Sequence, residues 1–403
     1  MPVFVGPGSA PDGGFEGKSD RVGFPTATSD PGSAVVGDMY VQTVGSGSTL
    51  RMYDGSSWGN ACPGGTVSAS GGNVNGTTAD GSKYHIFTAS GSLVVSEGGP
   101  VSILAIAGGG GGGVQHGGGG GAGALYFNEE LTLSATTYPI TIGNGGSGGT
   151  PPSNDNSADG GNTIFGPGTP LHIVVNGGGK GRKMRQPNTA SMPGGPGGCG
   201  GGGGMTPIHP SPPSRTPGGS VTAPPTHSLP SPLIFGNVGG EGTDYNAGPS
   251  GGTGGGGGGC GPNGGTGSNN VPDTNGTAPK GGDDYICPSD FLPASSIPTL
   301  GAALGTPGKF LGVPNPQPSD YRRAFGGGGA GGSHSPWGIY NPGGNYPDGG
   351  GGSASRTGGL GGVGNNGNGG VGLDGRGAGG GGSGSGNNQA GDGGNGVIII
   401  KYD

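Results

Sequence analysis

The chain has 403 residues, of which 115 are glycine and 38 are proline, and its formal net charge is −7. Only 27% of the residues are hydrophobic and 10% are charged, which excludes an ordinary apolar core for most of the chain. The thinly spread negative charge argues against nucleic acid as a partner. The longest apolar stretch, residues 101–107, is too short to span a bilayer. Residues 1–11 lack the basic start and apolar run of a secretion signal.

Residues 1–60 form a segment without glycine runs, and its pattern predicts a β-hairpin. Residues 39–41 and 50–53 supply the two strands, and residues 45–48 supply the turn. The large aromatic side chains of this segment include Tyr40, Tyr53 and Trp58. Residues 61–80 are rich in Gly, Ser, Thr and Asn, which is typical of a linker.

The third region, residues 81–403, has its apolar side chains clustered at its two ends. Strands are predicted for residues 83–88, 92–96, 101–107, 124–127, 131–135, 138–142, 171–175 and 397–402. Pieces from both ends should therefore form one small β-layer that closes the domain. Helical periodicity is nearly absent, and short helical turns are expected only at residues 300–304 and 320–325.

Nearly pure glycine tracts separate the longer loops of this region, at residues 108–113, 117–121, 200–204, 254–259 and 326–329. The tracts break at irregular places, which excludes collagen because collagen needs a strict three-residue repeat. Ordered glycine needs a compensating interaction, and backbone N–H and C=O groups are the only plentiful ones. Polyglycine-II helices bonded side by side would satisfy these groups. We therefore predict a mainly β protein with polyglycine-II helices: a small β-layer plus a glycine-rich sandwich carrying long loops, with almost no α-helix.

Long inserts interrupt the glycine tracts and carry most of the prolines. A compact basic cluster lies in one insert and comprises Lys180, Arg182, Lys183 and Arg185. Guanidinium groups pair well with carboxylate or phosphate, so this cluster is a candidate for contact with an anionic surface. The alternative is an ordinary solvated loop.

Aromatic side chains gather in the later inserts. Trp337, Tyr340 and Tyr346 lie close together, and Tyr321 precedes Arg322 and Arg323. Aromatic rings can stack on sugar faces and are enriched in recognition surfaces. The alternative is that these rings fill the loop layer as a small core.

Motifs for catalysis, metals and cofactors are weak, and we predict no enzyme, no metal and no cofactor. Residues 12–19 lack the first glycine of a P-loop, and residues 362–367 match G-x-G-x-x-G only as glycine-rich sequence does by chance. The adjoining Asp283 and Asp284 would point to opposite sides of an extended backbone. Cysteines 199 and 260 are expected as small buried thiols, with a disulfide between them as the alternative.

The order of these pieces resembles the phage glycine-rich domain, over roughly residues 81–403. The resemblance rests on residues 84–88, 101–113, 117–124, 138–146 and 396–400. Residues 37–40 and 50–58 are similar to a short repeat common near the start of tail-fibre and other virion proteins, especially of marine and cyanobacterial phages. The long inserts and the N-terminal segment depart from compact members of the family, so no binding residue is carried over.

The resemblance implies a non-enzymatic structural protein of a bacteriophage virion, made in the host cytoplasm. The expected role is a tail fibre or adhesin whose loops bind a receptor during host attachment. Implied partners are other phage structural proteins, through Tyr40, Tyr53 and Trp58, and a host surface polysaccharide or outer-membrane component. A homo-oligomer is expected, with a trimer as one option. The alternative is a capsid decoration, head-fibre or accessory protein that stabilises the particle.

Overall fold

All regular elements that the structure describes are β-strands, in agreement with the predicted fold class. This computed structural model describes residues 26–27, 29, 32, 35–36, 38–44, 47–53, 56, 58–60, 67–78, 81–151, 156–184, 193–206, 215–222, 233–243, 253–261, 281–288, 291, 323–332, 357–358, 367–384 and 386–403. Within these ranges no helix is long and apolar enough to cross a membrane.

The N-terminal segment contains a four-stranded sheet in the order β1-β2-β3-β4. Its strands are β1 (Thr26–Ala27), β2 (Met39–Val44), β3 (Gly47–Tyr53) and β4 (Trp58–Asn60). Strands β2 and β3 form the predicted antiparallel hairpin, but its turn is shorter than predicted, because Gly47 and Ser48 already pair with Val44 and Thr43.

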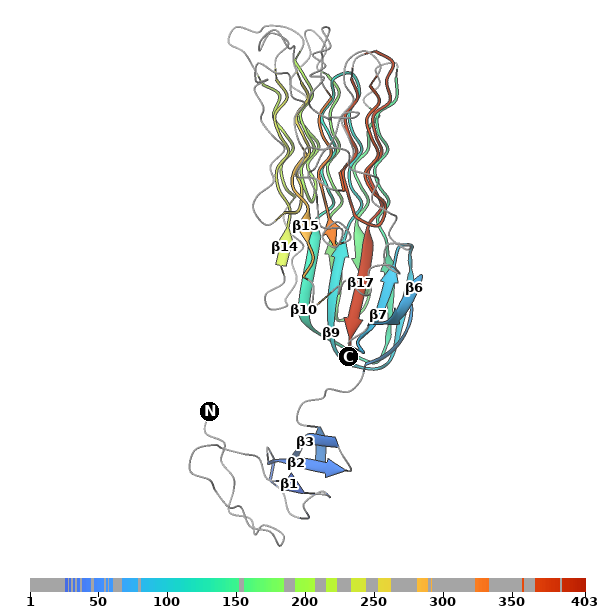
Figure 1. Ribbon diagram of the computed structural model, residues 1–403, viewed down its shortest axis with the longest axis vertical. Coiled ribbons are helices and arrows are strands. Elements are labelled where there is room, and N and C mark those ends of the chain that lie inside the picture. Colours follow the sequence, from blue (N-terminus) through green and yellow to red (C-terminus); the bar gives the residue numbers. More distant parts are fainter. Residues whose placement is uncertain are drawn as a thin grey trace, which may run out of the picture.

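A six-stranded sheet forms the first layer of the glycine-rich region, in the order β14-β10-β9-β17-β7-β6. Its strands are β6 (Val74–Thr77), β7 (Lys83–Phe87), β9 (Gly99–Ile106), β10 (Leu125–Leu133), β14 (Leu233–Phe235) and β17 (Val397–Tyr402). Strand β17 pairs antiparallel with both β7 and β9. The last strand of the chain is therefore central to the sheet, as the apolar clusters at both ends of the region predict (Figure 1).

A five-stranded sheet forms the second layer, in the order β13-β12-β11-β8-β5. Its strands are β5 (Ser68–Gly71), β8 (Gly91–Glu97), β11 (Thr137–Thr141), β12 (Thr163–Phe165) and β13 (Ile173–Val175). Side chains from both sheets share one buried core that includes Leu93, Ile103, Tyr138 and Ile400. Burial of these side chains supplies the main hydrophobic stabilisation of the sandwich.

The six-stranded sheet also has a buried outer face, which explains its continuous apolar runs. In β17, Ile398 and Ile400 belong to the core between the sheets, while Val397 and Ile399 belong to a second cluster on the other face. That second cluster is covered in part by β15 (Tyr285–Ile286) and β16 (Ala324–Phe325), which pair antiparallel. A strand buried on both faces lacks the alternation of a half-exposed strand.

Two expectations need correction. The predicted linker at residues 61–80 contains β5 and β6, whose small and polar residues pair with β8 and β7. The predicted helical turn at residues 320–325 is wrong at its end, because Ala324 and Phe325 form β16 and are fully buried. Strand pairing and burial outweigh local propensity at both places. The other predicted helical turn, residues 300–304, lies outside the described residues.

Beyond the sandwich, the glycine tracts continue from the strands as wavy parallel segments (Figure 1). Their hydrogen bonds are lateral and rotate among neighbours. In the tract at 108–113, Gly108 and Gly111 donate to residues 161 and 158, Gly109 and Gly112 to residues 394 and 391, and Gly110 and Gly113 to residues 121 and 118. Each neighbouring segment therefore accepts a hydrogen bond from every third residue of the tract. Three residues per turn is the period of polyglycine II, and that helix type itself stays a prediction.

The tracts lie too close for side chains. A Cβ atom on Gly120 would lie well inside contact distance of the Gly110 carbonyl oxygen, and one on Gly145 would meet the Gly393 carbonyl oxygen in the same way. The residues from 108 to 113 and from 117 to 124 are all buried. Lateral backbone bonding, as predicted from composition, is confirmed for these tracts.

Candidate functional site

The end of the tracts farthest from the sandwich, here called the distal end, is organised around the turn at residues 114–116. Gln115 and His116 both have positive φ, of 55° and 57°, which is uncommon for residues other than glycine. Backbone bonds join this turn to other tract ends: Met184 N to Val114 O at 3.3 Å, Met205 N to His116 O at 3.2 Å, and His116 N to Ser383 O at 3.0 Å. Several inserts predicted from the sequence begin at these tract ends.

Threonine side chains join further tract ends near this turn. The hydroxyl oxygens of Thr206 and Thr216 lie 3.0 Å apart, and those of Thr243 and Thr253 lie 3.2 Å apart. All four residues are at most 3% exposed. A backbone bond from Thr206 N to Thr243 O joins the two pairs. The base from which these inserts leave is therefore hydrogen-bonded from tract to tract.

Three members of the predicted basic cluster lie on the tract that approaches this end. Lys180, Arg182 and Lys183 are half-buried, and Arg185 lies outside the described residues. The Arg182 Nε donates to the Pro193 carbonyl oxygen at 3.1 Å. The backbone N–H of Lys180 donates to Asp159 Oδ1 at 2.8 Å. The backbone of the described cluster residues thus belongs to the lattice rather than to a separate loop.

None of the other predicted contact residues that the structure describes lies beside this basic cluster. Arg323 lies before β16, at the sandwich end of the tract 326–332, and its Nη1 donates to the Cys287 carbonyl oxygen at 3.1 Å. Tyr321, Arg322, Trp337, Tyr340 and Tyr346 lie outside the described residues. In the N-terminal sheet, Tyr40 is 1% exposed and Tyr53 is half-buried. The side chain of Trp58 lies outside the description.

A set of outward-facing Asn and Asp residues, which the sequence analysis did not single out, lines the sides of the lattice. We call it the Asx ladder. Their Oδ1 atoms accept backbone N–H groups of the neighbouring chain segment at 2.7–3.0 Å. Its members are Asn156, Asp159, Asn162, Asn368, Asp374, Asp392 and Asn395.

Spacing is the signal that identifies the Asx ladder in the sequence. Members on one tract recur at every third residue, as in Asn156, Asp159 and Asn162, all of them exposed. Two neighbouring tracts show the same spacing, with Asn368, Val371 and Asp374 exposed on one and Gln389 and Asp392 on the other. The side chains therefore satisfy N–H groups at the lattice surface, where no further glycine tract follows.

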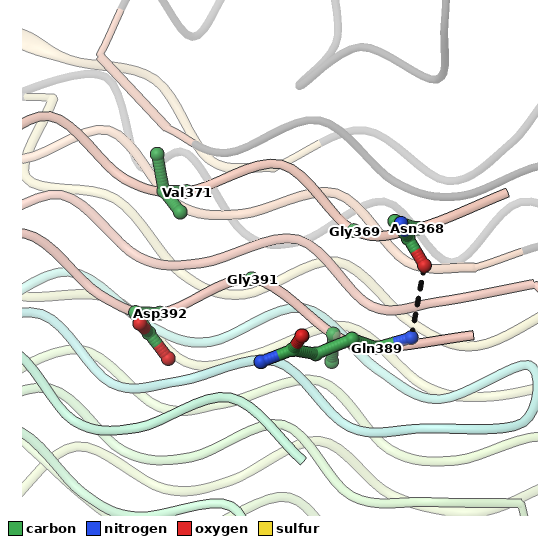
Figure 2. A pocket seen from close by; sticks show the side chains of 7 residues that line it. Asn368, Gly369, Val371, Gln389, Gly391 and Asp392 are labelled. Atoms are coloured by element: carbon green, nitrogen blue, oxygen red, sulfur yellow. Dashed lines mark hydrogen bonds between the residues drawn. The ribbon is translucent and has the colours of Figure 1, made fainter. Parts of the chain in front are cut away.

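A small surface pocket lies on this side of the lattice, between the tracts 367–374 and 388–396 (Figure 2). Its volume is about 170 Å³. The side chains of Asn368, Val371, Gln389 and Asp392 line it, together with backbone of Gly369 and Gly391. Asn368 Oδ1 accepts the Gln389 N–H at 3.0 Å, which holds the two tracts together at one end of the pocket.

A buried polar cluster lies where the lattice meets the sandwich. Arg376 is fully buried, with its guanidinium carbon 4.7 Å from the centre of the Phe325 ring and its Nη1 donating to Ala324 O at 3.0 Å. Burial lowers the pKa of Arg376 to about 10, and the charge of Asp284 opposes this shift. Asp284 accepts hydrogen bonds from the backbone N–H and hydroxyl of Thr357. This cluster joins segments far apart in the sequence.

The predicted buried thiols are confirmed for Cys199 and Cys260. Both are 0% exposed, and their sulfur atoms lie 3.4 Å apart, well beyond the length of about 2.05 Å in a disulfide. Burial, followed by the neighbouring Cys199, raises the pKa of the Cys260 thiol. Among the residues that the structure describes, no three His, Cys, Asp or Glu side chains are grouped to hold a metal ion.

Together, the strands, tracts and outer faces of the described residues define a mainly β protein whose sandwich continues into a hydrogen-bonded glycine lattice with polar sides. Comparison with known families agrees: residues 86–286 match the family described as the glycine-rich domain. This segment is therefore a glycine-rich domain. The matched segment ends before β16 and β17, so the folded unit extends beyond it. No curated protein matches the sequence.

Proposed function

We propose that this protein is a non-enzymatic phage virion protein, a tail fibre or adhesin that touches the host cell with its distal end. The observation that carries the proposal is that the chain enters the glycine-rich region at one end and several inserts leave it at the other. Residues 67–68, where the described chain leaves the N-terminal segment, enter the sandwich at the side away from the tracts, because Ser68 pairs with Glu97. The described chain stops at Met184, Thr206 and Gly332 near the opposite, distal end, where three of the inserts begin.

The lattice supports this role because it is a stiff support built almost without side chains. Every third N–H of a tract returns to the same neighbour, and the buried threonines join tract ends at the base of the inserts. Binding residues are often carried on loops that a rigid scaffold positions. Lys180, Arg182 and Lys183 add positive charge near this end in a chain whose net charge is negative.

An exchange of inserts tests the proposal. The segments 185–192 and 207–214 would be replaced by those of a homologue from a phage with another host, in the full chain and on intact particles. The matched control exchanges residues 223–232, which connect Thr222 and Leu233 at the other end of the tracts. We expect adsorption to follow the distal inserts and to ignore the control exchange. Unchanged adsorption after both exchanges would overturn the adhesin role.

Location on the particle separates the proposal from its alternative. Labelled antibody against the N-terminal segment should mark the tail of intact particles in electron micrographs. Labelling over the whole capsid lattice would instead favour a decoration protein and would remove the tail-fibre role.

A further inference from the structure

We propose that the pocket between the tracts 367–374 and 388–396 binds one neutral pyranose unit of a glycan. This side of the lattice is distinct from the distal end, so the proposal holds whether or not the distal inserts contact a host. The volume of the pocket, about 170 Å³, lies below the roughly 300–1,000 Å³ typical of pockets for drug-sized ligands. A single sugar ring therefore suits it better than a nucleotide-sized cofactor.

The polar groups of the pocket match vicinal hydroxyls, each of which both donates and accepts. Asn368 and Gln389 are exposed side-chain amides that offer donors and acceptors together. Asp392 adds a carboxylate whose Oδ1 accepts the Gly148 N–H at 2.7 Å. That bond fixes the position of the carboxylate at the edge of the pocket.

The apolar part of the pocket matches the C–H side of a sugar ring. Val371 is 63% exposed and is the large apolar side chain among the lining residues. Figure 2 shows Val371 and Asp392 on neighbouring tracts. Each lies three residues after another lining residue of its own tract, Asn368 and Gln389 respectively. One ring can thus contact an apolar group and hydrogen-bonding groups at the same time.

The base of the pocket is built in advance of binding. Gly369 N–H donates to Gln389 O, and Gly391 N–H donates to Gly381 O, both at 2.8 Å. A preorganised site loses little conformational entropy when a ligand binds. Among the described lining residues only Asp392 is charged, so a neutral sugar is favoured over a uronic acid or a phosphate.

Saturation-transfer NMR on the full-length protein tests this proposal. The probes are glucose, galactose, mannose and N-acetylglucosamine at about 10 mM, which would detect a Kd of about 1 mM. We expect transfer to at least one of them and none to glucuronic acid. Gln389→Ala and Val371→Asp should each weaken binding about fivefold or more, and Asp392→Asn should reduce the discrimination against glucuronic acid.

The matched control is Asp374→Asn. Asp374 belongs to the Asx ladder, lies three residues after Val371 on the tract 367–374, and does not line the pocket. Binding by this variant should equal that of the unchanged protein. Because Gln389 and Val371 are exposed, their replacements should leave the fold intact, which circular dichroism can check. The absence of transfer from all four sugars, or a Kd from sugar titration that is unchanged in both pocket variants, would overturn the proposal.

Discussion

At the level of single residues, glycine is required in the lattice because neighbouring backbones occupy the place of a side chain. Gly120→Ala should destabilise the protein by about 3 kcal/mol or more, since its Cβ would collide with the Gly110 carbonyl group. Gly91→Ala is the control, because its Cβ would meet only Phe87 ring atoms at 3.9 Å. Urea denaturation should show a change within about 0.5 kcal/mol for the control. Equal effects of the two substitutions would contradict close tract packing.

The Asx ladder makes a prediction about hydrogen-bond acceptors. Asn395→Ala would leave the Gly145 N–H without the acceptor that it has at 2.8 Å, at a cost of about 1–3 kcal/mol. Asn395→Asp keeps an oxygen at the same position and should retain most of the stability. The midpoint of urea unfolding measures both variants. If the aspartate variant were as unstable as the alanine variant, the acceptor would not be the stabilising group.

His85 makes the stability of the sandwich depend on pH. Its Nδ1 must donate to the Gly71 carbonyl oxygen at 2.7 Å, so in the neutral ring Nε2 accepts from the Tyr402 hydroxyl at 2.8 Å. Burial lowers the pKa of His85 below 6.5, although the Gly71 bond opposes this shift. The unfolded chain therefore binds the proton more readily, and stability is lost as pH falls below about 6.5.

His85→Gln should flatten the dependence of the unfolding free energy on pH between about 7.5 and 5. His172→Gln is the control, since His172 is exposed in the turn between β12 and β13. Urea unfolding at several pH values is the measurement. An unchanged slope in the His85 variant would show that another group governs this range.

At the level of elements, β17 completes the six-stranded sheet by pairing with both β7 and β9, and it lies outside the segment matched to the family. Removing residues 397–403 would expose one edge each of β7 and β9 and take away the buried Val397, Ile398, Ile399 and Ile400. We expect the truncated chain to lose cooperative unfolding, because burying each such side chain contributes about 1.5–3 kcal/mol. Thermal unfolding followed by circular dichroism is the measurement. A truncated chain with a normal transition would show that the sandwich closes without β17.

Strands with many apolar residues could be predicted from the sequence, and strands with few could not. Residues 101–107 and 397–402 are apolar except for Ser102 and Lys401, and the structure places them at β9 and β17. Strands β5 and β6 have the composition of a linker and could not be recognised from it. They are ordered by pairing with β8 and β7 and not by burial of large apolar side chains. Likewise, Ala324 and Phe325 join β16 through a partner strand about forty residues away.

The candidate site was less predictable than the fold. Lys180, Arg182 and Lys183 stood out as charges, but the Asx ladder is concealed by the glycine around it. Asn156, Asp159 and Asn162 acquire meaning only when every third residue faces outward, and that period follows from lateral bonding between distant tracts. Pocket residues such as Asn368 and Gln389 come from two tracts whose pairing no local pattern indicates.

At the level of the whole molecule, the lattice should be as protected as a conventional core. The N–H groups of Gly254, Gly255, Gly257 and Gly258 all donate to other segments, and these residues are buried. Native-state hydrogen exchange should therefore slow these amides by roughly 10³-fold or more relative to an unfolded chain. Exchange at the unfolded rate would mean that the lattice does not persist in solution, and the distal end would lose its rigid support.

Because the hydrogen-bond direction repeats every three residues, the position of a residue within that repeat decides whether it faces the lattice or the solvent. Because Gly108 and Gly111 face the same neighbour, one inserted residue would turn everything after it by a third of a revolution. Outward asparagines and aspartates would then point into the lattice, and buried glycines would point to solvent. Insertions and deletions within tracts should consequently be tolerated in multiples of three, while the connecting inserts can change length freely.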